Sequence, residues 1–380
     1  MGMAKEKHRI RLGILLGGRS SEHEVSLSSA ASVIGALDPS EFEVTAIGIT
    51  RSGKLASSAE VRAMLPAELL DRVRLGGGSE EVLPWTGGFD AQREETNRRP
   101  EIIFPLLHGP YGEDGTIQGL LEIAGVPYVG CGVLASAVGM DKDAMKRLFA
   151  QARLPIVPFR VESSRGLEQR LDSLRHEIEV QFGYPVFSKP ANLGSSVGVC
   201  KIHHAGEFDD AILSSAQFDH KIIIEKGIDA RELECAVLGN NTPEASVVGE
   251  VVPACEFYNY EAKYANPDSR VQIPADIVDD KAKAVRDLAL RAFRTIDGSG
   301  LARVDFFLDR KSGAVWLNEI NTMPGFTSIS MYPKLWNACG VPFDRLIRRL
   351  VDLGFERYRE RMDLSHESSA GGMVAKPQKA

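Results

Sequence analysis

The sequence is poor in cysteine, and the five cysteines that it has lie far apart. No CxxC spacing occurs, so neither a zinc site nor a disulfide framework is indicated, and a reducing cytoplasm fits best. Positive charge is in deficit, since the formal net charge is −7, which argues against a nucleic-acid partner held by phosphate neutralisation. Apolar runs of membrane-spanning length are absent, so no membrane partner is expected.

Two common nucleotide-binding signatures are also missing. The glycine loop that begins at Gly17 lacks the GxGxxG spacing, which weakens the hypothesis of an NAD-dependent dehydrogenase. The Gly/Ser-rich segment at 189–199 lacks the GxxxxGKS/T spacing of a Walker A loop, and a predicted strand follows it instead of a helix. A nucleotide would therefore have to be bound in another way.

The overall composition is that of an ordinary soluble globular protein. With 380 residues, 43% hydrophobic and 26% charged, two or three domains are expected. The N-terminal apolar run is very short and ends in Gly-Gly, so it predicts a first strand rather than a signal peptide. Strands at 8–16 and 42–49 flank a helix, and this β-α-β order predicts a parallel sheet. Residues 51–100 are predicted to be an irregular insertion with at most a short helix or hairpin, and a tail from about 364 is predicted to be disordered.

The most informative stretch runs from residue 301 to 331 and predicts two apolar strands joined by a turn. If Asp309 pairs with Val315 across a five-residue loop, Asp305 faces Glu319 on the neighbouring strand. Side chains that face each other on one side of a sheet lie roughly 5 Å apart. The two carboxylates are therefore expected to converge.

The same pairing adds an amide and a guanidinium to these carboxylates. Side chains alternate along a strand, so Arg303 joins Asp305 on one face and Asn321 joins Glu319. Oxygen ligands of this kind suit Mg²⁺, which uses one or two carboxylates together with substrate phosphates. The alternative is a solvated charged face with an ordinary ion pair, but carboxylates placed opposite each other favour a bound cation.

Two glycine-rich loops follow predicted strands of the first sheet, where open α/β sheets bind ligands. The first, at 17–26, places Ser and Glu at the start of a helix and predicts an anion site there, although Glu22 could simply be a first-turn charge. The second, at 108–119, permits close backbone approach to a ligand. It could equally be a turn before a helix capped by Asp114 or Thr116.

A second module carries the remaining candidate charges. Lys142 lies in the first turn of a predicted helix, where the dipole disfavours a cation, so it either holds an anion or is solvated. Lys189 ends a strand before the Gly/Ser-rich segment, whose amides could cradle phosphate or form only a flexible hairpin loop. Glu225 and Glu232 flank a strand end where a nucleotide could lie, with surface ion pairs as the alternative. The long aromatic loop at 253–275 predicts a lid.

Taken together, these segments resemble the D-alanine–D-alanine ligases of the ATP-grasp superfamily over roughly residues 8–361. Any one motif would be weak evidence for the resemblance, but eight motifs in the order found in the family are highly specific evidence. The departures are Asn259, where Asp is often found, and Met331, where Leu is common. The motifs are GGRSSEHEVSLSSA, HGPYGEDGTIQG, MDK, KPANLGSSVGV, EKGIDARELE, YNYEAKY, ARVDFF and NEINTMPGFTSIS.

The resemblance implies an α/β chain, α+β in its ATP-binding part, with a three-domain ATP-grasp fold. The implied domains are an N-terminal open parallel-sheet domain at 1–139, a central ATP-grasp domain at 140–228 and a C-terminal catalytic domain at 229–363. It also implies the ATP-dependent joining of two D-alanines through an acyl phosphate, for peptidoglycan precursors. Two Mg²⁺ or Mn²⁺ ions, a homodimer and a cytoplasmic location complete what the family implies.

The resemblance also assigns roles to residues at matching motif positions. ATP would be bound by Lys142, Lys189, Ser195, Ser196, Val197, Glu225, Lys226 and Glu232. The metal ions would be bound by Asp305, Glu319 and Asn321. The two D-alanines would be bound by Glu22, His108, Lys263, Ser330 and Met331. The catalytic set would be Glu22, Ser195, Tyr264, Arg303 and Gly325, with Arg303 and Gly325 at the oxyanion.

Other functions remain as alternatives. Related ligases that accept D-lactate or D-serine share the ATP machinery, and Tyr264 in an intact EAKY favours the dipeptide-forming type. A nucleotide-binding regulator without catalysis would be expected to lack a metal ligand or the oxyanion arginine, and none of these is missing. The dehydrogenase hypothesis is disfavoured by the metal hairpin as well as by the glycine spacing.

Overall fold

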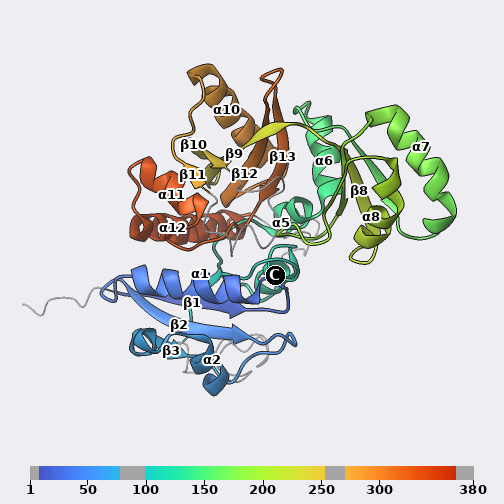
Figure 1. Cartoon of the computed structure of the whole chain (residues 1–380). Helices are drawn as coiled ribbons and strands as arrows, with labels where there is room; N and C mark the ends of the chain where they lie inside the picture. The colour runs from blue at the N-terminus through green and yellow to red at the C-terminus, as the bar shows by residue number, and fades with distance from the viewer. Residues whose placement is uncertain (1–7, 78–98, 253–269, 365–380) are drawn as a thin grey trace, which may run out of the picture.

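The computed structural model describes residues 8–77, 99–252 and 270–364, which form three β-sheets with their helices (Figure 1). In Figure 1 one sheet lies at the bottom, and the other two lie side by side above it. Most of the predicted lid and the predicted tail beyond 364 lie outside the described residues.

The first sheet is parallel throughout in the order β3-β2-β1-β4, which confirms the β-α-β prediction. The prediction for 51–100 was wrong in part, because this region adds a helix, a 3₁₀ turn and an edge strand to the sheet. Beyond β4, a single parallel bridge joins Ile103 to Tyr128. The elements are β1 (Ile10–Gly17), α1 (His23–Ala36), β2 (Phe42–Ile49), α2 (Ser58–Met64), η1 (Ala67–Arg72), β3 (Val73–Leu75), β4 (Ile102–Pro105) and α4 (Thr116–Ile123).

The second sheet is four-stranded and antiparallel, in the order β5-β8-β6-β7. Its helices α7 and α8 pack on it through apolar side chains such as Leu174, Ile178 and Phe208. The predicted Gly/Ser-rich hairpin loop connects β6 to β7. The elements are α5 (Val133–Met140), α6 (Lys142–Gln151), β5 (Phe159–Ser163), η4 (Glu168–Arg170), α7 (Leu171–Phe182), β6 (Val186–Pro190), β7 (Cys200–Ile202), η5 (Ala205–Glu207), α8 (Phe208–Ser215) and β8 (Lys221–Lys226).

The third sheet is five-stranded and antiparallel, in the order β11-β10-β9-β12-β13. Helices α5, α6 and α10 contribute to the core on one of its faces, and α11 and α12 to the core on the other. The elements are β9 (Ala230–Gly239), β10 (Glu244–Val252), β11 (Arg270–Gln272), α10 (Asp279–Thr295), β12 (Gly300–Asp309), β13 (Val315–Asn321), α11 (Met331–Ala338) and α12 (Phe343–Met362).

Helix α12 ties the third sheet to the first. Its buried residues Leu346 and Leu350 belong to a core that includes Leu301 of β12 and Phe104 of β4. The approach is close at Gly354, where a Cβ would come 2.8 Å from Ile102 Cδ1 and 2.8 Å from the Tyr128 carbonyl oxygen. This packing brings the carboxyl end of β4 and the loop that follows it toward the hairpin of the third sheet.

The hairpin of β12 and β13 confirms the predicted pairing of Asp305 with Glu319, but by a different route. The register next to the turn differs from the prediction, since Leu308 rather than Asp309 pairs with Val315 and six residues rather than five separate the paired positions. A bulge at Asn318 then adds one residue to β13 and restores the predicted register beyond it. The shift in register at the turn and the extra residue of the bulge offset each other, so Asp305 faces Glu319 as predicted.

Candidate functional site

The hairpin presents Arg303, Asp305 and Asn321 as one connected group. Arg303 donates from Nε and Nη2 to the two oxygens of Asp305, each at 2.7 Å, and its Nε lies 3.0 Å from Glu234 Oε2. Asn321 Nδ2 donates to Asp305 Oδ2 at 3.0 Å. Burial disfavours the charged guanidinium, but its carboxylate neighbours hold the pKa of Arg303 well above its usual value. Arg303 is therefore a fixed cation at the edge of the group.

Lys142 lies between this hairpin and the Gly/Ser-rich loop. Its Nζ donates to the Leu193 carbonyl oxygen at 2.7 Å and lies 3.6 Å from Glu319 Oε2. Helix α6 starts here because the Asp141 side chain accepts hydrogen bonds from two first-turn amides. Of the two interpretations of Lys142, the structure favours a cation that is held in place rather than solvated.

Two lysines share the carboxylate of Glu225, which is 2% exposed. Lys146 Nζ lies 2.8 Å from Oε1, and Lys189 Nζ lies 2.5 Å from Oε2. Burial alone would raise the pKa of Glu225, but the two ammonium groups outweigh it and lower the pKa to about 2. The surface ion pair considered for Glu225 is thus a buried one, with an excess of positive charge that suits an anionic ligand.

The Gly/Ser-rich loop has an unusual backbone and reaches the first sheet. Ser195 and Ser196 adopt φ angles of 51° and 58°, a left-handed conformation that costs non-glycine residues about 1–2 kcal/mol each. Such strain is concentrated at ligand clamps and switch segments. Ser195 Oγ donates a hydrogen bond to Glu22 Oε1, so the loop contacts the start of α1.

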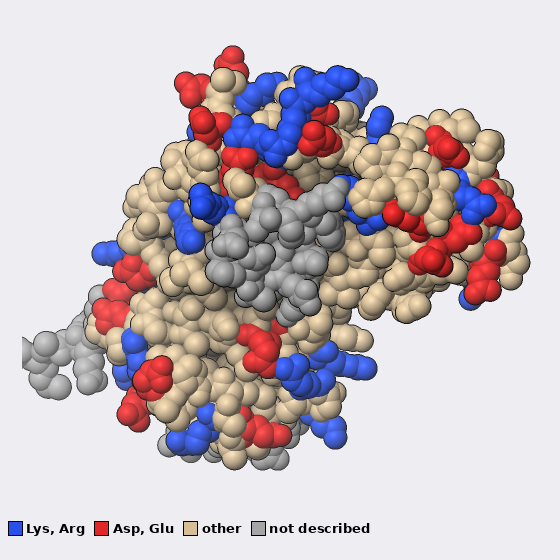
Figure 2. All heavy atoms as spheres, in the orientation of Figure 1, with Lys and Arg blue, Asp and Glu red and all other residues tan. Residues whose placement is uncertain are grey.

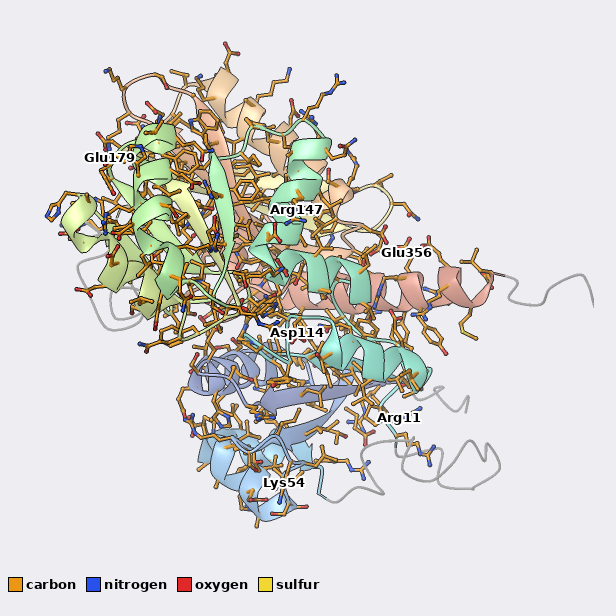
Figure 3. The ribbon with its side chains drawn as sticks, turned by 90° about the vertical axis from the view of Figure 1, so that its right-hand side faces the viewer. Arg11, Lys54, Asp114, Arg147, Glu179 and Glu356 are labelled. Atoms are coloured by element: carbon orange, nitrogen blue, oxygen red, sulfur yellow. The ribbon has the colours of Figure 1, made fainter. Side chains whose placement is uncertain are left out.

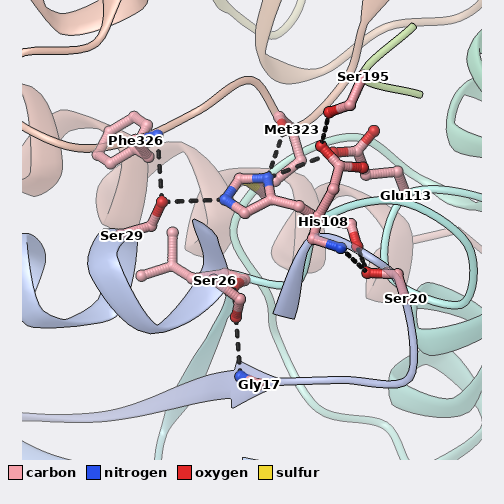
Figure 4. Close-up of polar contacts among 12 residues, drawn as sticks. Gly17, Ser20, Ser26, Ser29, His108, Glu113, Ser195, Met323 and Phe326 are labelled. Carbon is pink, nitrogen blue, oxygen red and sulfur yellow. Dashed lines mark hydrogen bonds and ion pairs between the residues drawn. The ribbon is translucent and has the colours of Figure 1, made fainter. Parts of the chain in front are cut away.

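His108 organises the loops of the first sheet (Figure 4). Its Nδ1 lies 3.1 Å from the Met323 carbonyl oxygen and 3.3 Å from Glu113 Oε1, and its Nε2 lies 3.0 Å from Ser29 Oγ. Ser29 Oγ in turn accepts a hydrogen bond from the Phe326 amide at 3.3 Å. This chain connects α1, the loop after β4 and the segment after β13.

The pKa values of both His108 and Glu113 lie above their usual values, for different reasons. Burial would lower the pKa of His108, but the hydrogen bond and charge of Glu113, the charge of Glu22 and the Met323 carbonyl together outweigh it, and the pKa lies above its usual value. Burial also raises the pKa of Glu113, which faces the charge of Glu22. The carboxylate of Glu22 is close to backbone on two sides, since a Cβ on Gly109 or Gly194 would come 2.8 or 3.1 Å from its Oε2.

A pocket joins these groups. Its lining comes from the loop after β4, the junction of α5 and α6, the Gly/Ser-rich loop and β13. Figure 3 places Asp114, of the loop after β4, where the first sheet meets the other two. The lining residues are Glu113, Gly139, Met140, Lys142, Leu193, Gly194, Glu319, Ile320, Asn321 and Thr322.

The donors at this pocket are compatible with a hard cation. No cluster of three His, Cys, Asp or Glu side chains forms within 8–77, 99–252 and 270–364. The two carboxylates of Asp305 and Glu319 nonetheless face each other, each beside a cation, Arg303 at 2.7 Å and Lys142 at 3.6 Å. Two carboxylates and an amide, completed by phosphate oxygens, form the kind of ligand set that Mg²⁺ uses.

The segment after β13 brings together three further predicted residues. Met331 begins α11, and Ser330 precedes it as the N-cap residue. A Cβ on Gly325 would lie 3.4 Å from Ser330 Oγ, which also accepts a hydrogen bond from the Thr327 amide at 3.1 Å. Amides at such a helix start can receive a carboxylate.

The other predicted residues lie around this centre or outside it. Val197 donates its amide to the Gly194 carbonyl oxygen at 3.2 Å within the Gly/Ser-rich loop. Lys226 ends β8 with an exposed side chain, and Glu232 lies on β9 opposite Phe307. Lys263 and Tyr264 lie outside the described residues.

Sequence reasoning missed Lys146 and Glu113. Lys146 follows Lys142 by four residues on α6, a spacing that places both on one helix face and could have drawn attention to it. Its partner Glu225 is distant in sequence, so spacing could not reveal the ion pair. Glu113 was visible only as one of several polar residues in a glycine-rich loop.

Comparison with known proteins matches the chain over most of its length. Residues 11–131 match the family model described as D-ala D-ala ligase N-terminus, and residues 148–352 match D-ala D-ala ligase C-terminus. A D-alanine--D-alanine ligase of Heliobacterium modesticaldum is 51% identical, over 92% of this chain and 96% of that protein. One of Acetivibrio thermocellus is 44% identical, over 93% and 97%.

Solved structures of similar architecture carry related names. The D-alanine-D-alanine ligase from Coxiella burnetii superposes with a TM-score of 0.73 at 33% identity, covering 93% of this chain and 96% of that one. The VanG D-Ala:D-Ser ligase from Enterococcus faecalis superposes with a TM-score of 0.76 at 32% identity, covering 91% and 100%.

Proposed function

Because the chain belongs to the D-alanine–D-alanine ligase family, we propose how its residues share the work of the reaction that joins two D-alanines with ATP. In that reaction a carboxylate oxygen of the first D-alanine attacks the γ-phosphorus of ATP, and ADP leaves. The amine of the second D-alanine then attacks the acyl phosphate, loses a proton, and phosphate leaves. The observation that carries the proposal is the convergence of Lys142, Glu319 and Asn321 in one pocket.

ATP is held by the cations and the Gly/Ser-rich loop. Lys142 and Lys189 supply charge to its phosphates, and the segment Ser195–Val197 folds over them with its amides. Glu225 and Glu232 meet the adenine amine and the ribose, with Lys226 beside them. The excess of ammonium over carboxylate around Glu225 supports this assignment.

Asp305, Glu319 and Asn321 would hold Mg²⁺ or Mn²⁺. Such ions, when bound, offset the negative charge that develops on the transferred phosphoryl group. Lys142 lies beside Glu319 and would contact the ATP phosphates when they are bound. Arg303 lies beside Asp305 and would contact the acyl group. The chain itself thus contributes a balanced set of charges around the reacting atoms.

The two D-alanines are recognised at their charged ends. Glu22 takes the ammonium group of the first D-alanine, with His108 lining the same pocket and Ser195 fixing the Glu22 carboxylate. Ser330 and the Met331 amide receive the carboxylate of the second D-alanine at the start of α11. Arg303 and the Gly325 segment stabilise the oxyanion of the tetrahedral intermediate. Lys263 and Tyr264 complete the site from outside the described residues.

The same fold could carry D-serine or D-lactate as second substrate. One similar structure is named a D-Ala:D-Ser ligase, whereas the relatives of 44–51% identity described above are named D-alanine--D-alanine ligases. The higher identity favours the dipeptide. The test is phosphate release by the purified protein with ATP, Mg²⁺ and D-alanine; release that requires D-serine or D-lactate as well would support the alternative.

We further propose three domains, at 1–139, 140–228 and 229–363, each built on one sheet, and a homodimer in the cytoplasm. Helices α4 and α5 pack together and expose Leu120, Ile123 and Leu134, with Ile123 74% exposed. Neighbouring apolar side chains on a surface are typical of an interface.

On the face shown in Figure 2 acidic and basic side chains are interspersed. No helix of the described residues is long and apolar enough to span a membrane.

A further inference from the structure

Lys146 is a buried cation to which the reaction above gives no role. Its side chain is 1% exposed, and its Nζ lies 2.8 Å from Glu225 Oε1. Burying an ammonium group costs free energy unless a counter-charge pairs with it. The Lys146 ammonium is therefore expected to serve the carboxylate with which it pairs. That partner, Glu225, already has a second cation in Lys189 at 2.5 Å.

The ion pair joins helix α6 to strand β8. Helix α6 packs into the core of the five-stranded sheet through Met145, which precedes Lys146, and Phe149, which lies one turn after it. Glu225 lies near the end of β8, in the four-stranded sheet. Lys146 therefore links Glu225 to the core that α6 shares with the hairpin strands β12 and β13.

The position of Lys146 is fixed by an aromatic ring as well as by charge. Its Nζ lies 5.6 Å from the ring centroid of Phe159, within the range of a cation–π contact. Phe159 is the register partner of Glu225 across β5 and β8. The ammonium is thus held from two adjacent strands, and with it the orientation of the Glu225 carboxylate.

We propose that Lys146 is a positioning residue for recognition of the nucleotide base, because it orients the Glu225 carboxylate to accept a hydrogen bond from the exocyclic amine of adenine. This inference rests on the proposed function, which places adenine at Glu225. The Lys146 ammonium lies 2.8 Å from Oε1, and an incoming amine would share Oε2 with Lys189.

The chemistry predicts discrimination between bases. The lowered pKa of Glu225 keeps the carboxylate ionised at neutral pH, so it can only accept hydrogen bonds. Adenine presents a donor at its 6-position, whereas hypoxanthine presents a carbonyl oxygen that would face the carboxylate as a second acceptor. A hydrogen bond to a charged group is worth about tenfold or more in affinity.

The test compares adenine and hypoxanthine nucleotides on matched variants. Dissociation constants for ADP and IDP are measured by calorimetry, and kcat/KM is measured with ATP and ITP. Lys146→Met should lower the preference for the adenine nucleotide by about tenfold, with IDP affinity little changed. Lys146→Arg should retain most of the preference. Arg147→Met, the neighbouring exposed cation labelled in Figure 3, should leave it unchanged.

A double variant tests whether Lys146 acts through Glu225. In the Glu225→Gln background, Lys146→Met should lower the preference for ADP no further, because the carboxylate that Lys146 orients is absent. The second change also removes the Lys146 ammonium that Glu225→Gln alone would leave buried without its carboxylate. Equal losses for ADP and IDP, or an additional loss of preference in the Gln background, would overturn the proposal. Wild-type protein that binds ADP but forms no dipeptide would instead refute the proposed function and leave the role of Lys146 intact.

Discussion

At the scale of single residues, the site is built from charges that hold one another in place. Arg303 binds Asp305 by a two-bond contact at 2.7 Å, and Glu225 holds two lysines. Removing one member of such a pair is strongly destabilising because it leaves the other buried without a partner. Charges held in place by such pairs suit a site that must present fixed charge to a changing phosphoryl group.

Arg303→Ala should lower turnover by about a hundredfold or more, by analogy with the loss of an oxyanion-hole donor. Arg310→Ala is the matched control, since Arg310 lies in the turn of the same hairpin and pairs with exposed Asp229 at 3.3 Å. Steady-state kinetics with ATP and D-alanine measure both. Wild-type turnover in Arg303→Ala would remove this residue from the mechanism.

Glu225 predicts a pH dependence of stability. Its folded pKa of about 2 lies below the usual 4.5, so its stabilising contribution is present above pH 4.5 and is lost as the pH falls toward 2. The contribution is on the order of 3 kcal/mol. Glu225→Gln should therefore be less stable than wild type at pH 7, and the gap in unfolding free energy should narrow below about pH 5. Urea titrations at pH 7, 5, 4 and 3 measure the gap; a constant gap contradicts the assignment.

At the scale of elements, the hairpin shows what periodicity can and cannot predict. The alternation of a strand placed Asp305 opposite Glu319, and this was correct. The turn length and the bulge at Asn318 were not foreseen, because a bulge leaves apolar residues at odd spacing: Leu317 and Ile320 both face the core. The prediction held at the carboxylates because the two departures cancel there.

The loop after β4 is predicted to be sensitive to a single methyl group. Gly109→Ala would place a Cβ 2.8 Å from Glu22 Oε2 at a φ of +74°, and should raise the KM for D-alanine more than tenfold by displacing Glu22. Gly340→Ala has the same backbone cost, with φ +82° and nothing within 4 Å, and should lose only about 1–2 kcal/mol of stability. If the two variants shift KM alike, contact with Glu22 is irrelevant to D-alanine binding.

At the scale of the whole molecule, contacts distant in sequence decide the site. The strands, the parallel first sheet and the Gly/Ser-rich hairpin loop could be predicted from local patterns. The ion pair of Lys146 with Glu225 could not, because it joins helix α6 to strand β8 through residues 79 positions apart that no local pattern relates. The contact of Ser195 with Glu22 was implied by family resemblance and by nothing in the spacing.

The proposed dimer gives a prediction at this scale. Ile123→Glu on α4 should convert the protein to a monomer of 41.5 kDa, because it places a charge among Leu120 and Leu134. Val180→Glu on α7, an equally exposed position at 74%, should leave the dimer intact. Light scattering after gel filtration gives the mass. A wild-type monomer, or a dimer that persists in Ile123→Glu, would rule out this surface.

The most direct test of the central claim is to identify the product formed by purified protein with ATP, Mg²⁺ and an equimolar mixture of D-alanine, D-serine and D-lactate. Mass spectrometry of the mixture distinguishes the three possible products, and released phosphate gives the stoichiometry. Sequence identity of 44–51% to relatives named D-alanine--D-alanine ligases predicts D-alanyl-D-alanine as the main product, with one phosphate per dipeptide. A main product that contains D-serine or D-lactate, or phosphate release without any ligation, would contradict it.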